Sequence, residues 1–198
     1  TIDDWYQMKK NAKQNYKLMN DLDFVNANPS RYIGIELQSE LEGNGYTIKN
    51  FYTKYPLFTN LNRNTKIENL NIKNFNIDSS ENDLDVGICG WGSLYSMKNI
   101  NIEGYTAKTD NNANKRVGSI IANSLRGKLE NITISDVKIT ANNKQYLKLG
   151  GVIGEGSADI NNLVLENLLI DCKDNIESYV GGIIGMGNNG NNNCVQKN

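Results

Sequence analysis

Histidine is absent from the 198-residue sequence, and this absence excludes several familiar classes of enzyme. Without an imidazole the chain has no Ser-His-Asp or Cys-His nucleophile arrangement, no H-E-x-x-H zinc site and no imidazole-ligated metal. Cysteine is also scarce, and Cys89, Cys172 and Cys194 show no C-x-x-C spacing. Neither a zinc knuckle nor a disulfide framework is therefore expected.

Charge of one sign and long apolar runs are missing as well. The 21 Lys and Arg residues nearly balance the 22 Asp and Glu residues, so no broad basic face is expected and nucleic acid is not a predicted partner. No stretch approaches the roughly 18 apolar residues that a membrane-spanning helix needs, so no membrane insertion is expected. Asparagine, in contrast, is the most frequent residue, and proline occurs only twice. Because Asn is a poor helix former and a good turn former, a turn-rich β architecture is favoured.

Two blocks recur along the chain about every 31 residues, a period typical of stacked-coil folds. The first block aligns IENLNIKNFNI from Ile67, MKNINIEGYTA from Met97, LENITISDVKI from Leu129 and INNLVLENLLI from Ile160. The second block comprises VGICG from Val86, VGSIIA from Val117, LGGVIG from Leu149 and VGGIIG from Val180. We interpret one column of each block as a structural ladder, since stacked amides can donate to one neighbour and accept from the other. The ladder residues are Asn69, Asn99, Asn131, Asn162 and Asn193, with Gly87, Gly118, Gly150 and Gly181 in the second block.

Apolar residues alternate with polar ones inside the first block, and a period of two predicts strands rather than a helix. A bend follows, at residue types that tolerate a left-handed backbone at low cost. One apolar column holds Leu70, Ile100, Ile132 and Leu163, and the bend column holds Asn74, Gly104, Asp136 and Asn167. The pattern predicts an all-β fold, a right-handed parallel β-helix with coils of about 31 residues.

The two ends of the chain carry different expectations. The sequence pattern predicts a short capping helix and an extended lead-in strand in residues 1–24, and the β-helix itself in residues 25–198. Asn50 lies only 19 residues before Asn69, so we expect one shortened coil between these two positions. Asn193 begins a fifth repeat that stops at Asn198, so we expect the β-helix to be truncated in mid-coil and the parent chain to continue.

Several of these segments resemble a known family. The residues from Asn15 to Phe24, LEGNGYTIKNFY from Leu41, PLFTNL from Pro56, and the recurring xNLxIxN and VGGIIG blocks resemble the GLUG-motif β-helix. That element occurs in the non-catalytic N-terminal part of Gram-positive zinc metallopeptidases of the immunoglobulin A-cleaving type, and also in surface adhesins. The sequence departs from the family's usual acidic turn at Glu42, where Asp is commoner.

The resemblance implies a secreted or cell-wall-attached parent whose zinc and catalytic Glu lie outside this chain. No H-E-x-x-H helix maps onto any residue here. The first functional hypothesis is accordingly a non-catalytic module that binds substrate or acts as a rigid spacer. It would position a host glycoprotein or immunoglobulin for cleavage by another domain of the same polypeptide. No catalytic, cofactor-binding or metal-binding residue is assigned within the chain.

Two alternatives stay open. One is a β-helical adhesin or glycan-binding domain, in which the indole of Trp91 in the turn GWGSLY would stack on a sugar unless it folds back over the adjacent coil. The other is a polysaccharide lyase or glycosidase, which needs clustered or opposed carboxylates. Its candidate acids are Asp78, Glu81, Asp83, Asp85 and Asp110, with Arg116 as base or clamp. The candidate ligand contacts over all hypotheses are Trp91, Tyr95, Asp110, Arg116, Tyr146 and Tyr179.

Overall fold

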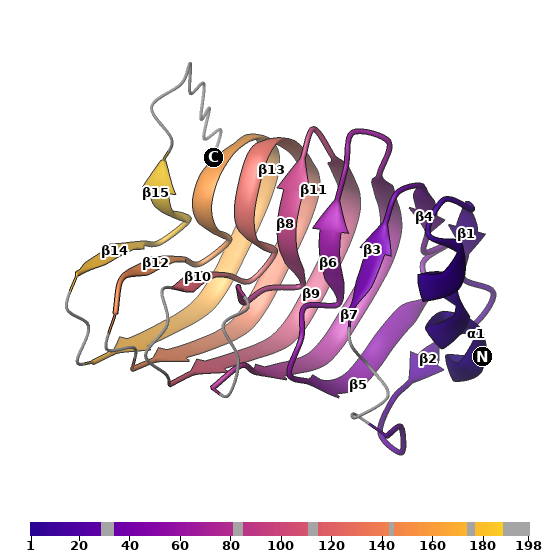
Figure 1. Cartoon of the computed structure of the whole chain (residues 1–198), viewed down its shortest axis with the longest axis horizontal. Helices are drawn as coiled ribbons and strands as arrows, with labels where there is room; N and C mark the ends of the chain where they lie inside the picture. The colour runs from indigo at the N-terminus through magenta and orange to yellow at the C-terminus, as the bar shows by residue number, and fades with distance from the viewer. Residues whose placement is uncertain (29–33, 81–84, 111–114, 143–144, 174–176, 188–198) are drawn as a thin grey trace.

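The computed structural model describes residues 1–28, 34–80, 85–110, 115–142, 145–173 and 177–187. It consists of stacked strands with one short helical segment at the N-terminal end of the stack (Figure 1). The helical segment is α1 (Ile2–Gln7), followed by a 3-10 turn at Met8–Asn11. The strands are β1 (Tyr16–Lys17), β2 (Leu22–Asp23), β3 (Ile35–Leu37), β4 (Glu40–Glu42), β5 (Thr47–Thr53), β6 (Phe58–Leu61), β7 (Lys66–Asp78), β8 (Cys89–Ser93), β9 (Ser96–Thr109), β10 (Lys115–Gly118), β11 (Ile121–Ala141), β12 (Leu147–Gly150), β13 (Ile153–Cys172), β14 (Ser178–Gly181) and β15 (Ile184–Gly187).

Strands in neighbouring coils pair in parallel, and the register follows the sequence repeat. Ile132 of β11 lies opposite Ile100 of β9 on one side and opposite Leu163 of β13 on the other. Ile100 in turn lies opposite Leu70 of β7. Because each partner is about 31 residues away along the chain, the molecule is a parallel β-solenoid. The predicted all-β class, the parallel coils and their period are confirmed.

The first coils are shorter than the rest, and one alignment within them is wrong. Asn74 Nδ2 donates to Asn50 Oδ1 across a separation of 24 residues, so Asn50 stacks on Asn74 and not on Asn69. The place next to Asn69 is taken by the turn that follows β4, where the Gly45 amide donates to the Asn69 carbonyl at 2.8 Å. The column of Asn69 and the column of Asn74 both carry Asn, so the residue type alone does not show to which column Asn50 belongs.

The coils turn at residues with a left-handed backbone. Asn131 has a φ of 54° and Asp136 a φ of 57°, and the same conformation recurs at the stacked positions. Those positions are Asn69, Asn99 and Asn162 at the first corner, and Asn74, Gly104 and Asn167 at the second. Asn, Asp and Gly adopt this conformation at the lowest cost, which accounts for their place in the repeat.

The amides at the first corner bind one another in a ladder. Asn99 Nδ2 donates to Asn69 Oδ1 at 2.8 Å, Asn131 Nδ2 donates to Asn99 Oδ1 at 3.0 Å, and Asn162 Nδ2 donates to Asn131 Oδ1 at 3.0 Å. The Gly column has a different cause. A Cβ atom at Gly118 would overlap the carbonyl oxygen of Ile121, so this column marks a close approach of two backbone segments.

Apolar columns fill the interior of the solenoid. Phe51, Phe75 and Tyr105 lie in register, with ring centroids 5.5 and 5.9 Å apart and nearly parallel planes. Ile132 is buried, whereas Leu163 in the last long strand is only half-buried. Burial of aliphatic and aromatic surface at about 25 cal/mol per Å² is the main stabilising contribution of each coil.

The N-terminal end is covered by α1. Thr1 and Asp4 form a capping box, and Trp5 is 2% exposed with its ring 6.3 Å from Phe24 and 6.1 Å from Phe58. β1 pairs with β4, and β2 pairs with β5, so the lead-in residues are already part of the stacked strands.

The other end of the solenoid is less covered. Within the described residues β13 pairs with β15 only near Ile153–Gly156, and its remaining outer edge has no strand partner there. Val180 is 48% exposed. Asn193 and the predicted fifth repeat lie outside the described residues.

Candidate functional site at the corner between two sheets

Two sheets meet at an angle beside the Gly column, and their outward side chains face each other across the corner. β10, β12 and β14 form a three-stranded sheet, and each chain segment then bends into β11, β13 or β15 of the larger sheet (Figure 1). Arg116 on β10 reaches Glu155 on β13, with Nε 2.6 Å from Oε2. Residues 39 positions apart are therefore in contact on the outer surface.

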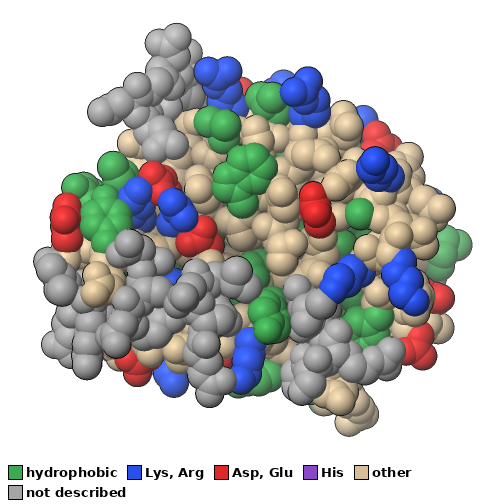
Figure 2. Space-filling model, in the orientation of Figure 1, with side chains coloured by type: hydrophobic (Ala, Val, Ile, Leu, Met, Phe, Trp, Pro, Cys, Tyr) green, Lys and Arg blue, Asp and Glu red, His purple; other side chains and the backbone are tan. Residues whose placement is uncertain are grey.

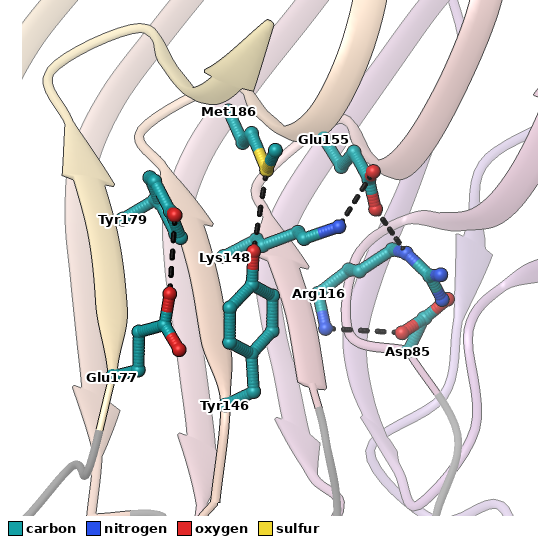
Figure 3. Close-up of polar contacts among 8 residues, drawn as sticks. All are labelled: Asp85, Arg116, Tyr146, Lys148, Glu155, Glu177, Tyr179 and Met186. Atoms are coloured by element: carbon teal, nitrogen blue, oxygen red, sulfur yellow. Dashed lines mark hydrogen bonds and ion pairs between the residues drawn. The ribbon is translucent and has the colours of Figure 1, made fainter. Parts of the chain in front are cut away.

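We define the corner cluster as the eight side chains drawn in Figure 3. They are Asp85, Arg116, Tyr146, Lys148, Glu155, Glu177, Tyr179 and Met186. Four neighbouring coils contribute, because Arg116 lies opposite Lys148, Lys148 lies opposite Tyr179, and the Arg116 amide donates to Asp85 Oδ1. In Figure 2 apolar, basic and acidic side chains lie together over the end of the molecule that carries these strands.

Charged groups in the corner cluster alternate in sign. Arg116 Nη1 lies 3.0 Å from Asp85 Oδ2, and Lys148 Nζ lies 2.6 Å from Glu155 Oε1. Glu155 therefore accepts from two cations, and its side chain and that of Lys148 are each only 13% exposed. The guanidinium of Arg116 joins two carboxylates from different coils, which fixes its orientation.

The two carboxyl groups of this network differ in their ionisation. Burial disfavours the charged form of Glu155, but the hydrogen bonds and charges of Lys148 and Arg116 outweigh it and lower the pKa of Glu155. Burial raises the pKa of Asp85, and the charge and hydrogen bonds of Arg116, together with the charge of Lys115, offset this only in part. The fold thus favours the ionised form of Glu155 and disfavours that of Asp85.

Aromatic rings form the outer part of the corner cluster. The Tyr146 and Tyr179 ring centroids are 5.5 Å apart, and Lys148 Nζ lies 5.1 Å from the Tyr146 centroid, within cation–π range. Tyr146 Oη donates to Met186 Sδ at 3.4 Å, and Tyr179 Oη donates to Glu177 Oε1 at 3.1 Å. Tyr179 is 39% exposed.

Trp91 and Tyr95 differ from their predicted setting. Trp91 lies on strand β8 and not in a turn, and it points outward with 39% of its surface exposed. Tyr95 points inward, is 1% exposed and shares a 2.9 Å hydrogen bond with Ser124. Its assignment as a candidate ligand contact is wrong, because the left-handed residue Leu94 turns the chain between the two aromatics.

The remaining candidate acids do not converge. Asp78 lies 3.7 Å from Lys108, Asp85 is bound to Arg116, and Asp110 is exposed at the end of β9. Glu81 and Asp83 lie outside the described residues. Among the residues that the structure describes, no group of three or more His, Cys, Asp or Glu side chains is placed to hold a metal ion.

Sequence reasoning found Arg116, Tyr146 and Tyr179 but missed Lys148 and Glu155. Glu155 occupies the position of Trp91 and Asn123, directly after the second repeated block, and is the charged residue of the three. That single departure from the repeat was the available signal.

Searches against protein-family models, curated proteins and solved structures found no match for this chain. Among the described residues no helix has the length and apolar character needed to cross a membrane.

Proposed function

We propose that this chain is a non-catalytic binding module of a larger extracellular or wall-attached protein, and that the corner cluster contacts a host glycoprotein. The resemblance to the GLUG-motif β-helix adds the proposal that the parent is a zinc metallopeptidase, with immunoglobulin as a candidate substrate. In this role the module holds the host protein at a fixed offset from a separate catalytic domain and raises its effective concentration there.

The observation that carries this proposal is the preorganised corner cluster. Arg116 and Lys148 are held by carboxylates from neighbouring coils, and the exposed Tyr179 ring is braced by Tyr146. Side chains whose rotamers are locked by their neighbours lose little entropy on binding, and Tyr and Arg are frequent contributors to binding energy. The rigid stack of coils supports the same role, because it fixes the distance between these side chains.

The same contacts favour binding over catalysis at this corner. A general acid or nucleophile has to reach the substrate, whereas Asp85 and Glu155 are both engaged by one guanidinium. Arg116 is itself held by these two carboxylates, so it is a poor candidate for the base of a lyase.

Surface plasmon resonance with the whole chain immobilised tests the proposal, with immunoglobulin A and a set of secreted host glycoproteins as analytes. We expect one of these proteins to bind, and Tyr179→Ala to weaken it roughly 10-fold, since an anchoring aromatic contributes about 1–2 kcal/mol. Tyr52→Ala is the matched control, because Tyr52 is an exposed tyrosine on β5, away from the corner. Wild-type protein that binds none of the analytes, or equal losses in both variants, would contradict the proposal.

A further inference from the structure

A row of outward side chains on the larger sheet places an exposed indole between two amides. Trp91 on β8 lies opposite Asn60 on β6 and opposite Asn123 on β11, one coil away on either side. We call these three residues the tryptophan strip. Figure 2 shows hydrophobic side chains at the surface over the region where Figure 1 places β8. Trp91 is 39% exposed, whereas Trp5, the other tryptophan, is 2% exposed.

The amides of the tryptophan strip differ from those of the Asn ladder in their hydrogen bonds. Ladder amides are one coil apart and bind one another. Asn60 and Asn123 are two coils apart, about 9.5 Å at the usual strand spacing, and the indole row separates them. Within the described residues neither side-chain amide makes a hydrogen bond, and Asn60 Oδ1 is buried without a partner.

Charges beside the strip are compensated at the Asn123 end of the row. Glu155 is the next residue of the row after Asn123, and it is bound to Lys148 and Arg116. Arg116 also binds Asp85, so these four residues carry no net charge. An acidic ligand therefore finds no uncompensated cation in this network. At the other end of the row Glu36 on β3 lies opposite Asn60, with its carboxylate exposed and accepting a hydrogen bond from Gln38. That carboxylate disfavours an acidic ligand and can accept from a sugar hydroxyl.

We propose that the tryptophan strip is a binding site for a neutral carbohydrate. The apolar face of a pyranose ring stacks on the indole of Trp91, and ring hydroxyls donate to and accept from the flanking amides. Asn123 makes the direct contact, and Asn60 contributes when a side-chain rotation opens its buried oxygen. This inference deepens the proposed function, because it names the glycan of the host glycoprotein as the part that is recognised, and it rests on that function only for the identity of the host.

A glycan array tests the site directly with the whole chain and its variants. It should carry neutral oligosaccharides ending in mannose, galactose or N-acetylglucosamine, and sialylated and sulfated ones. We expect binding to a neutral group, a loss of roughly 10-fold or more in Trp91→Ala, a partial loss in Asn123→Ala and partial retention in Trp91→Phe. Leu169→Ala, which removes another exposed apolar side chain on β13, should bind as the wild type does. Because these side chains point outward, an unchanged urea midpoint verifies that each variant is folded.

Several results would overturn the assignment. These are no binding to any neutral saccharide, binding confined to acidic saccharides, or binding that Trp91→Ala leaves intact. A host protein bound equally well before and after enzymatic removal of its glycans would refute the glycan site and leave the proposed function standing. Neutral saccharides bound through Trp91, without binding to any host protein, would refute the host and leave the site standing. The array should also carry free polysaccharides and protein-linked glycans. Comparing the two distinguishes a polysaccharide from a glycoprotein as the source of the same sugar.

Discussion

Asparagine serves two purposes in this molecule, and both act at a single residue. At the coil corner Asn131 adopts a φ of 54°, and its side chain donates to Asn99 and accepts from Asn162. Few residue types offer both the tolerance of a left-handed backbone and an amide that can donate and accept. The abundance of Asn in the composition follows from this double demand, repeated once per coil.

Substitutions at Asn131 separate the two contributions. Asn131→Gly keeps the left-handed backbone but loses two amide hydrogen bonds, so we expect a loss of about 1–2 kcal/mol in the free energy of unfolding. Asn131→Ala loses the same bonds and adds the cost of a left-handed alanine, roughly 1 kcal/mol more. Urea denaturation of both variants measures the difference. Equal midpoints for the two would show that the backbone conformation contributes nothing.

At the scale of the element, α1 matters because it closes one end of the stack. Six residues are too few for a stable isolated helix, so α1 is held by its packing. Trp5 supplies most of that packing through its edge contact with Phe24 and its tilted contact with Phe58. An uncovered first coil would expose unpaired strand groups and apolar side chains to solvent.

Removal of the Trp5 side chain should therefore loosen the first coils before the others. Large-to-small substitution of a buried tryptophan costs about 3–5 kcal/mol, and solenoids unfold in local units. In Trp5→Ala we expect hydrogen exchange to accelerate in β2, β3 and β6 and to stay slow in β9 and β11. Trp5→Phe, which keeps an aromatic ring, serves as the control and should show a smaller effect. Uniform acceleration over all strands would contradict local closure by α1.

The elements also show what the sequence can and cannot predict. The long strands were predictable because Leu70, Ile100 and Ile132 recur at one period and alternate with polar residues, so repeat and pattern agree. Asn50 was misplaced because two columns share the same residue type. Tyr95 was misassigned because the left-handed turn at Leu94 reverses the direction of the side chain, and Leu carries no signal for that conformation.

The candidate site was only partly predictable for a related reason. Arg116, Tyr146 and Tyr179 stand out as large polar residues near the repeats, whereas Lys148 and Glu155 acquire their role from the angle between two sheets. The contact of Arg116 with Glu155 joins residues 39 positions apart, and it is a property of packing and not of local pattern.

At the scale of the whole molecule, the corner cluster couples the stability of several coils to pH. Lys148 and Arg116 lower the pKa of Glu155 in the folded state. A carboxyl group whose pKa is lowered by folding stabilises the protein at pH values above its unfolded pKa of about 4.3. That stabilisation is lost as the pH falls through the lower folded pKa. Asp85 acts in the opposite direction, because burial raises its pKa and protonation relieves the cost of burying its charge.

Substitution of Glu155 by glutamine should therefore lower stability at pH 7 by roughly 2 kcal/mol, because two cations lose their shared carboxylate. As the pH falls below the unfolded pKa of about 4.3 toward the lower folded pKa, the difference between Glu155→Gln and wild type should shrink. Urea midpoints measured from pH 3 to pH 7 test this, with Glu166→Gln as the control for the same charge change at an exposed position on β13. A Glu155→Gln deficit that stays constant over this range would mean that the corner is held by packing of the Arg116 and Lys148 stems rather than by charge.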